Sequence, residues 1–292
     1  MKAAIYSRIM EEGQQEDVQL FFDELDAQKI EPLIFEHFFE QIKDLIHLPS
    51  TTKTFSLAEE LTSDIESVVS LGGDGTLLDT ITLVRDKNIP IMGINFGRLG
   101  FLASIGREEV KTAVKAIARR TYVMDKRTMI HLEANIPMFG NVPCGLNEFS
   151  IHKRDIASMI KIHTYLNGEF LNTYWADGLI VATPTGSTGY SLSCNGPIVF
   201  PDSGSFVITP VAPHNLNVRS IIVPDDNIIS FEIESRADEI ICALDSRREI
   251  VSKNVQLAVK RENFSINLVR LSENNFLQTL RNKLTWGLDK RN

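Results

Sequence analysis

Hydrophobic residues in the first third of the chain follow two alternating spacings. Short apolar runs, each typical of a buried strand, cover residues 3–7, 67–71 and 88–97. Longer stretches carry apolar residues at helical spacing, and these are residues 16–29, 37–45, 76–86 and 107–121. Strands that alternate with helices in this way predict βαβ units and a parallel sheet.

The pattern changes after about residue 122. From there the apolar segments are short, rich in strand-forming residues and closely spaced. Turn signals such as Asn167-Gly168 and Pro224-Asp225-Asp226 separate them. No convincing helix interrupts this stretch until residues 274–286, where the spacing predicts an amphipathic helix. The second part of the chain is therefore predicted to be all-β.

Length and composition agree with two domains. The chain has 292 residues and is 43% hydrophobic, which is enough for two packed cores. We predict an α/β domain of residues 1–122, completed by residues 263–292, and an all-β domain of residues 123–262. No apolar run approaches the roughly 20 residues of a membrane span, and the N-terminus turns acidic too early for a secretory signal. Three scattered cysteines form neither a disulfide framework nor a zinc spacing, so we expect a cytoplasmic protein.

The charge balance limits the classes of partner. The net charge is −8, from 30 basic and 38 acidic residues. An acidic protein argues against nucleic-acid partners and against anionic membranes, because both need basic surfaces. A small phosphorylated ligand stays compatible, because a local pocket can be basic on an acidic protein.

A glycine loop with a carboxylate, Gly72-Gly73-Asp74-Gly75, follows the strand that ends at Leu71. Ligands of open α/β sheets collect at the carboxyl ends of strands, where glycine N–H groups and a helix N-terminus bind phosphate oxygens. A carboxylate at this place favours phosphoryl transfer, because Asp74 can accept the proton of an acceptor hydroxyl. Mg²⁺ on a nucleotide would offset the repulsion. The alternative is a tight turn in which Asp74 caps the helix, since short glycine motifs often occur by chance.

A second polar block, DGLIVATPTGSTGYSLS, occupies residues 177–193. Asp177-Gly178 opens a short apolar strand, and residues 183–193 hold seven hydroxyl-bearing side chains and two glycines. We expect this loop to wrap a polar ligand, with Tyr190 stacking on a flat ring or hydrogen-bonding a ribose. The alternative is a Ser-, Thr- and Gly-rich turn cluster of a β-sandwich.

These motifs, in this order, resemble those of the NAD kinases. The resemblance rests on the segments at residues 72–76 (GGDGT), 94–103 (INFGRLGFLA), 147–148 (NE), 177–193, 208–226 (ITPVAPHNLNVRSIIVPDD) and 244–247 (LDSR). Together they cover roughly residues 65–250. The glycine loop alone is shared with diacylglycerol kinases, sphingosine kinases and phosphofructokinases, whereas the Asn-Glu pair and the long hydroxyl-rich block are more specific.

The resemblance implies an enzyme that transfers the terminal phosphate of ATP to the 2′-hydroxyl of the adenosine ribose of NAD, giving NADP. Some members of the family also use polyphosphate. It implies Mg²⁺ or another divalent metal, for which no ligands are assigned, and a homodimer or homotetramer. The implied fold is a Rossmann-like α/β domain and a sandwich-like β domain with the ligand between them. The C-terminal helix would pack back on the first domain.

Site residues follow position by position from the same resemblance. Asp74 matches the general base. The contacts with NAD would be Asp74, Gly75, Phe101, Asn147, Glu148, Asp177, Thr188, Gly189, Tyr190, Ser193, Ala212, Asp245 and Arg247. The contacts with the phosphates of ATP are predicted to be Gly72, Gly73, Gly75 and Thr76.

Departures from the family pattern lie at the edges of this site. Ser246 follows Asp245 where the family has glycine, and Arg247 stands where a Gln or a similar residue is common. Ser220 replaces the usual Pro, and Trp175 lies near Asp177 where some members place an Arg. These changes affect fine ligand contacts and the choice between NAD and NADH.

Four other features have less specific interpretations. Residues 152–155 (HKRD) are expected to form a solvated turn. Asp79 is expected at the surface, because five residues along a helix it lies off the face of Asp74. Arg98 either contacts a phosphate or a partner subunit, or caps a helix. His214 is the best ligand candidate among the histidines.

Two other functions share some of these features. A lipid or sphingoid-base kinase has the same glycine loop, but Asn147-Glu148 and the block that contains Gly186 argue against it. A non-catalytic nucleotide sensor on the same fold has no need of a base among phosphates, so Asp74 argues against it.

Overall fold

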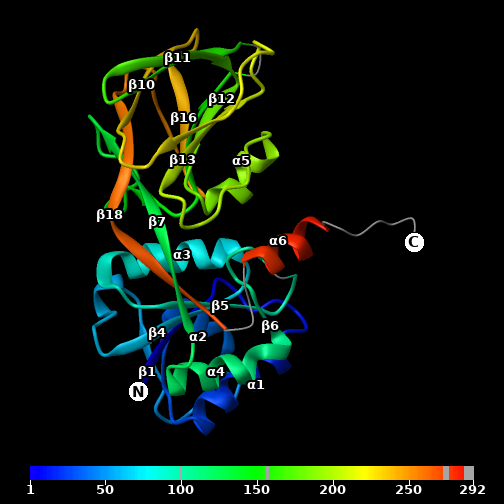
Figure 1. Cartoon of the computed structure of the whole chain (residues 1–292). Coiled ribbons are helices and arrows are strands. Elements are labelled where there is room, and N and C mark those ends of the chain that lie inside the picture. Colours follow the sequence, from blue (N-terminus) through cyan, green and yellow to red (C-terminus); the bar gives the residue numbers. More distant parts are fainter. Residues whose placement is uncertain (99, 156–157, 272–275, 286–292) are drawn as a thin grey trace. The chain divides into compact units, whose positions relative to one another are not determined.

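The computed structural model describes residues 1–98, 100–155, 158–271 and 276–285 (Figure 1). Contacts along the chain divide it into two units. Unit 1 contains residues 1–126 and the chain from residue 266 onward, and unit 2 contains residues 127–265. The chain passes from one unit to the other within two long strands, β7 (Val123–Ala134) and β18 (Leu257–Arg270).

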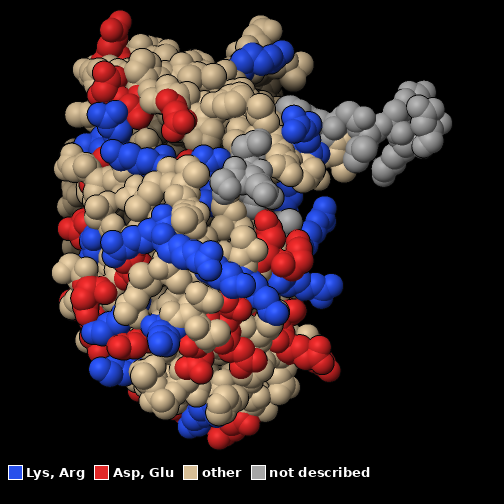
Figure 2. Space-filling view, turned by 60° about the horizontal axis from the view of Figure 1, so that its bottom comes forward, with Lys and Arg blue, Asp and Glu red and all other residues tan. Residues whose placement is uncertain are grey.

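Charged side chains of both signs are interspersed on the face shown in Figure 2. Basic groups are therefore available locally even though the net charge is −8. Within the described ranges, no helix combines the length and the apolar composition that crossing a membrane would require.

A parallel sheet with the strand order β3-β2-β1-β4-β5-β18 forms the centre of unit 1. Its strands are β1 (Lys2–Tyr6), β2 (Glu31–Phe35), β3 (Lys53–Phe55), β4 (Ile65–Leu71), β5 (Ile91–Asn95) and the end of β18, with β6 (Ile105–Gly106) beside β5. From β1 the chain adds β2 and β3 on one side and then returns to add β4 and β5 on the other. Open α/β sheets bind their ligands where the order reverses in this way, which here is between β1 and β4.

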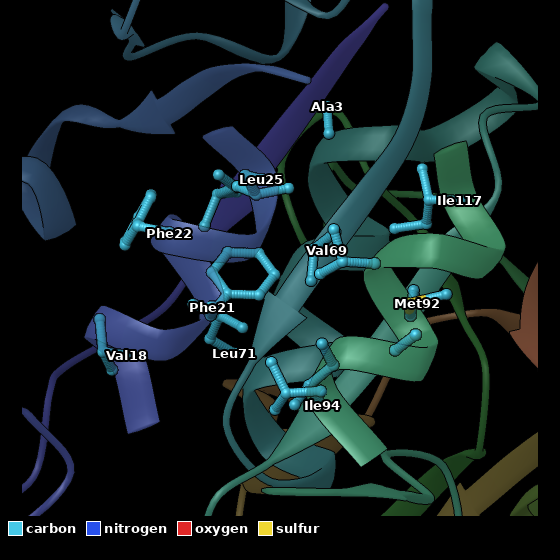
Figure 3. Packing of buried hydrophobic residues seen from close by; sticks show 14 of the residues in the cluster. Ala3, Val18, Phe21, Phe22, Leu25, Val69, Leu71, Met92, Ile94 and Ile117 are labelled. Carbon is cyan, nitrogen blue, oxygen red and sulfur yellow. The ribbon is translucent and has the colours of Figure 1, made fainter. Parts of the chain in front are cut away.

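Helices connect these strands and bury their apolar faces against the sheet. They are α1 (Gln15–Ala27), α2 (Glu36–Ile42), α3 (Asp74–Val84) and α4 (Val110–Arg119), with 3-10 helices η1 (Ala58–Glu60), η2 (Arg85–Lys87) and η3 (Arg107–Glu109). Helix α1 buries Val18, Phe21, Phe22 and Leu25, which recur with the helical period. These side chains belong to one core with Val69, Leu71, Met92, Ile94 and Ile117 (Figure 3). Truncating a buried phenylalanine of such a core typically costs about 3–5 kcal/mol.

The C-terminal helix α6 (Phe276–Leu284) belongs to unit 1 by its contacts, and its Leu280 is buried. It corresponds to the predicted helix 274–286, of which residues 274, 275 and 286 lie outside the described residues. The sequence pattern missed β2 and β3. The reason is that β2 begins with Glu31-Pro32 and two of the three side chains of β3 are exposed, so neither strand has the apolar run of a buried strand.

Unit 2 consists of two largely antiparallel sheets. In the first, β11-β10-β15-β18 are neighbours in that order, with β7 beside β18 and β8 beside β7. The new strands here are β8 (Cys144–Gly145), β10 (Ile160–Leu166), β11 (Glu169–Ala176) and β15 (Ile229–Glu234). The second sheet has the order β14-β13-β12-β9-β16-β17. Its strands are β9 (Glu148–Lys153), β12 (Gly178–Ala182), β13 (Ser205–Val211), β14 (Ile221–Pro224), β16 (Glu239–Leu244) and β17 (Arg247–Ser252).

Side chains from both sheets of unit 2 form one core, in which the rings of Phe149 and Phe231 lie 6.2 Å apart. This arrangement is a β-sandwich, and it confirms the predicted fold class of an α/β part and a β part. One expectation is corrected, because two short helices, η4 (Gly186–Thr188) and α5 (Tyr190–Ser193), follow β12. Sequence periodicity missed them because hydroxyl groups rather than apolar side chains occupy much of their buried side.

Candidate functional site

The glycine loop of unit 1 joins the end of β4 to the start of α3. Gly72 has a φ of +146°, and a Cβ at this position would lie 2.5 Å from Oγ1 of Thr76, so only glycine fits. Helix α3 begins at Asp74. The N–H of Gly72 donates to the carbonyl oxygen of Ile94 at 2.8 Å, and that of Thr76 donates to the carbonyl oxygen of Gly73 at 3.0 Å. The backbone donors that the loop can present at the carboxyl end of β4 are therefore those of Gly73, Asp74 and Gly75.

The carboxylate of Asp74 is held by a second loop of unit 1. Its Oδ2 accepts the N–H of Phe101 at 2.8 Å, and its Oδ1 accepts those of Leu102 at 3.1 Å and Ala103 at 2.9 Å. Gly100 makes this close approach possible, because a Cβ on Gly100 would lie 1.7 Å from Oδ1. The structure thus brings Phe101 to Asp74, and the contact runs through the backbone of Phe101.

A pair of residues that the sequence analysis did not connect lies beside this loop. Arg8, just after β1, donates from Nε and from Nη2 to the two carboxylate oxygens of Asp79 on α3, the latter at 2.7 Å. The hydroxyl of Tyr6 donates to Asp79 at 3.3 Å, and burial together with Asp79 raises the pKa of Tyr6 to about 12. Nη1 of Arg8 lies 3.2 Å from the place of a Cβ on Gly75.

Asp79 is partly exposed, in agreement with the expected surface position, and the structure adds an ion pair with Arg8 that the sequence analysis did not predict. Its side chain is 28% exposed and is the partner of Arg8. Position on a helix predicts which face a side chain shares with its helix neighbours, but not which residue of an adjacent strand meets it. Arg98, also near this site, is exposed, and its carbonyl oxygen accepts the Nδ2 hydrogen of Asn95 at 2.8 Å.

In unit 2, the backbone around Asn147 and Glu148 is held from two sides. Oδ2 of Asp245 accepts the N–H of Leu146 at 2.8 Å, and Oδ1 accepts those of Asn147 at 2.8 Å and Glu148 at 3.2 Å. From the other side, the N–H of Thr183 donates to the carbonyl oxygen of Asn147 at 2.8 Å, and the Thr183 hydroxyl donates to that of Leu146 at 2.5 Å. The segment is therefore fixed before any ligand contributes.

Arg247 holds the start of the same segment. Its Nη1 donates to the carbonyl oxygen of Val142 at 2.6 Å, and its Nη2 donates to that of Cys144 at 2.5 Å. The next residue, Gly145, has no room for a side chain, because a Cβ on it would lie 2.9 Å from Oδ1 of Asp245. The side chains of Asp245 and Arg247, which the resemblance associates with NAD, thus contact the backbone of their own unit.

Glu148 carries a buried carboxyl group with an unusual proton affinity. Within the part of the chain that the structure describes, its Oε2 is buried and has no hydrogen-bond partner. Burial, and then the nearby charge of Asp245, raise the pKa of Glu148 to about 8. The carboxyl faces Gly189, where a Cβ would lie 3.6 Å from Oε2. Burial therefore favours the protonated form of Glu148, which can donate a hydrogen bond.

Most hydroxyl groups of the block at residues 183–193 point into unit 2. Four of its side chains are buried, namely Thr183, Thr185, Ser187 and Ser191. Ser187 donates to the carbonyl oxygen of Pro184 at 2.6 Å, and Ser191 shares a hydrogen bond of 2.8 Å with Thr209. The expectation that the whole block offers hydroxyls to a ligand is corrected to a smaller set, because buried polar groups need internal partners. Thr188, Tyr190 and Ser193 remain at least partly exposed.

Asp177 has a cationic partner that the sequence analysis assigned to a solvated turn. Nζ of Lys153 lies 2.6 Å from Oδ1 of Asp177, and the Lys153 side chain is only 19% exposed. Lys153 is the last residue of β9, which runs next to β12, so the pairing of strands brings the two together. The ring of Tyr190 lies 5.6 Å from that of His152, and Ala212, with a φ of +45°, directly follows β13 near Asp177. His214 is exposed.

A divalent metal would find few protein ligands. In the described ranges, no three His, Cys, Asp or Glu side chains cluster in a way that could hold a metal ion. Asp74 offers one carboxylate at the glycine loop, and three N–H groups already contact it. This donor set fits a Mg²⁺ ion that is bound mainly by nucleotide phosphates and water, as is usual for that ion.

Comparison with known families decides the family of the chain. Residues 13–122 match the model of the ATP-NAD kinase N-terminal domain, and residues 146–271 match that of the ATP-NAD kinase C-terminal domain. The chain belongs to the NAD kinase family. It is 50% identical over 290 residues to the NAD kinase of Cytophaga hutchinsonii, covering 99% of both chains. It is 42% identical over 294 residues to the NAD kinase of Flavobacterium psychrophilum, covering 100% of both.

Solved structures show the NAD kinase fold of the chain. Yeast NADH kinase, solved with NADH, aligns with a TM-score of 0.89 at 21% identity, over 99% of this chain and 88% of that one. An NAD kinase from Archaeoglobus fulgidus, solved with ATP, aligns with a TM-score of 0.77 at 24% identity, over 98% and 99%. The resemblance to NAD kinases that the motifs predicted is confirmed, and the chain is an enzyme of the kinase class.

Proposed function

We propose that the chain transfers the terminal phosphate of ATP to the 2′-hydroxyl of the adenosine ribose of NAD, giving NADP and ADP, with Asp74 as general base. The observation that carries the proposal is the carboxylate of Asp74 at the start of α3, oriented by three backbone N–H groups. Membership of the NAD kinase family supports the reaction class. The NADH of the yeast structure and the ATP of the archaeal structure support the two classes of ligand.

The hydrogen bonds of Asp74 support one of its two oxygens as the proposed proton acceptor. In the reaction, the ribose oxygen bonds to the terminal phosphorus while the bond to the β,γ-bridging oxygen breaks, and that electron pair leaves with ADP. The hydroxyl proton must go to a base. Each carboxylate oxygen has two acceptor positions. Oδ1 uses both for Leu102 and Ala103, whereas Oδ2 uses only one for Phe101. We therefore assign the proton to Oδ2.

The same hydrogen bonds supply the positioning that this reaction needs. A hydroxyl is a poor nucleophile near neutral pH, so most of the acceleration comes from correct placement of hydroxyl, base and phosphorus. Three backbone N–H donors orient the carboxylate without any contribution from the substrate. No conformational freedom of Asp74 then has to be lost when the complex forms.

For the dinucleotide, we propose contacts with two residues of unit 1, Gly75 and Phe101, and with a larger set in unit 2 that includes Glu148. The proposed contacts are Gly75, Phe101, Asn147, Glu148, Asp177, Thr188, Gly189, Tyr190, Ser193 and Ala212. A neutral Glu148 supports this role, because a protonated carboxyl can donate to a ribose oxygen and does not repel the pyrophosphate. We propose that Asp245 and Arg247 act by holding the backbone of residues 142–148.

For the donor, we propose that Gly72, Gly73, Gly75 and Thr76 surround the phosphates of ATP. Mg²⁺ or another divalent ion would be carried by those phosphates. When bound, the ion neutralises charge on the transferred phosphoryl group. Polyphosphate as an alternative donor offers the same phosphate chemistry.

The test is incubation of the protein with Mg-ATP and NAD, followed by an assay for NADP. Formation of NADP with equimolar ADP is expected. Binding of both nucleotides without NADP would favour a nucleotide sensor. Phosphorylation of diacylglycerol or sphingosine in place of NAD would favour a lipid kinase. Parallel reactions with NADH and with polyphosphate define acceptor and donor preference.

Three further proposals concern the domains, the localisation and the oligomeric state of the enzyme. The predicted domains, residues 1–122 with 263–292 and residues 123–262, would carry the glycine loop and most dinucleotide contacts, respectively. We propose a cytoplasmic enzyme that forms a homodimer or homotetramer, as the family resemblance implies. Light scattering coupled to size-exclusion chromatography measures the mass in solution, and a monomer would contradict this part.

A further inference from the structure

Arg8 lies where the sheet of unit 1 reverses its strand order. Strands β1 and β4 are parallel neighbours, and Tyr6 pairs with Ser70 in their register. The buried hydroxyl of Ser7 then donates to the carbonyl oxygen of Leu71 at 2.7 Å. Arg8 therefore leaves the sheet directly after a fixed anchor and beside the start of the glycine loop.

The guanidinium of Arg8 is oriented by Asp79. Nε and Nη2 both donate to this carboxylate, which fixes the plane of the guanidinium. The hydroxyl of Tyr6 also donates to Asp79 and steadies it. These two contacts leave Nη1 for another partner. That atom lies 3.2 Å from the place of a Cβ on Gly75, and the Arg8 side chain is 47% exposed, so a ligand at the loop can reach it.

The chemistry of this place suits a phosphate group. A guanidinium binds phosphate oxygens through directed N–H donors, and here it lies beside the N–H groups of the first turn of α3. Asp74 adds negative charge to the same loop, which disfavours a polyanionic donor unless cationic donors are also present. Asp79 offsets part of the charge of Arg8, so the pair acts mainly by holding N–H donors in a fixed position.

We propose that Arg8 binds the terminal phosphates of the nucleoside triphosphate, and that Asp79 is the positioning residue that holds it there. The inference rests on the proposed function, because it takes the glycine loop as the donor site. It adds a donor-binding residue that no motif in the sequence indicated, together with a role for Asp79.

Steady-state kinetics of four variants test this inference. The variants are Arg8→Ala, Arg8→Lys, Asp79→Asn and a matched control, Arg120→Ala. Arg120 forms an equivalent bidentate pair with Glu66, at 2.8 Å and 2.6 Å, near the opposite end of β4. The control therefore removes an exposed arginine fork of unit 1 that is far from the glycine loop along the strand.

We expect Arg8→Ala to lower kcat/KM for ATP by roughly 10- to 100-fold, as for loss of one directed donor to a phosphoryl group. KM for NAD should stay within about twofold. Arg8→Lys should recover part of the loss, because it keeps the charge but not the fork, and Asp79→Asn should give an intermediate loss. Arg120→Ala should behave as the wild type.

Binding of inorganic triphosphate, measured by calorimetry, provides a readout that does not depend on turnover. The wild type and Arg120→Ala should bind it equally, and Arg8→Ala should bind it at least several-fold more weakly. If the wild type makes no NADP, the proposed function fails, while this binding comparison still tests Arg8. Equal triphosphate affinity and equal kcat/KM for Arg8→Ala and Arg120→Ala would overturn the inference. An Arg8→Ala variant in which KM rises equally for ATP and for NAD, and whose melting temperature falls, would also overturn the inference.

Discussion

Oδ1 of Asp245 accepts the backbone N–H of Asn147 at 2.8 Å, although 98 residues separate the two along the chain. The same carboxylate also accepts the N–H groups of Leu146 and Glu148. A turn between β16 and β17 thus sets the position of the Asn-Glu pair, which is the proposed dinucleotide contact. The position of that contact therefore depends on Asp245, whose side chain binds the backbone of its own unit.

Replacing this carboxylate should affect NAD more than ATP. Asp245→Asn places an amide NH₂ against backbone N–H groups, and we expect the free energy of unfolding to fall by roughly 1–3 kcal/mol. KM for NAD should rise several-fold while KM for ATP changes little. Urea unfolding and steady-state kinetics measure the two effects, with the exposed Asp226→Asn as control. An equal rise of both KM values would contradict a local role for Asp245.

Removing the proposed base should abolish most turnover without unfolding the protein. In Asp74→Asn, the amide oxygen can still accept the N–H groups of Leu102 and Ala103, whereas the NH₂ group takes the place of the acceptor for Phe101 and costs some stability. The amide cannot take the hydroxyl proton. We expect kcat to fall on the order of 10²-fold or more. Saturating kinetics and the melting temperature check this, with Asp64→Asn, an exposed partner of Lys2, as control. Near-full activity of Asp74→Asn would remove Asp74 from the role of base.

The position of the Asp74 carboxylate can be tested without changing it. In Gly100→Ala, the new Cβ would lie 1.7 Å from Oδ1 of Asp74, so either the carboxylate or the loop must move. We expect a loss of kcat comparable with that of Asp74→Asn, because misplacement of a base by about 1 Å costs about as much as 10²-fold. Gly97→Ala is the control, since its Cβ would meet Asn95 at an ordinary 3.5 Å. Full activity of Gly100→Ala would show that catalysis does not require the observed position of the Asp74 carboxylate.

The proton on Glu148 predicts a pH dependence of stability. Burial raises the pKa of both Glu148 and Asp245, but three backbone N–H bonds act to lower that of Asp245, so we assign the bound proton to Glu148. The folded pKa of about 8 exceeds the ordinary 4.5, so the folded protein keeps a proton that the unfolded chain loses. The free energy of unfolding should therefore fall as pH rises from about 5 to about 8, by up to about 1.4 kcal/mol per pH unit, and then level off.

Glu148→Gln isolates this contribution, because glutamine cannot ionise. Its stability, measured by urea unfolding at several pH values, should vary less between about pH 5 and 8 than that of the wild type. The exposed Glu232→Gln in the same unit should follow the wild-type profile. Parallel profiles for all three proteins would place an ordinary, ionised carboxylate at residue 148.

The features that depend on local sequence were predictable, and those that depend on pairing between distant segments were not. Helix α1 follows from the spacing of Phe21 and Leu25, and the glycine loop follows from the abrupt end of β4. The Arg8–Asp79 fork follows only from the parallel pairing of β1 with β4, which no spacing reveals. Hydroxyl groups in the block that contains Ser187 could not be divided into inward and outward sets, because hydroxyl side chains carry no apolar periodicity.

The strand order of unit 1 also constrains how the chain is made. Leu268 of β18 pairs with Ile91 of β5, so the sheet lacks one strand until more than 260 residues have left the ribosome. Synthesis proceeds from the N-terminus, and the whole of unit 2 emerges in between. During that interval the edge of β5 at Ile91 has unpaired backbone groups, which is the kind of edge that invites aggregation. The first unit to be synthesised is therefore the last whose sheet can be completed.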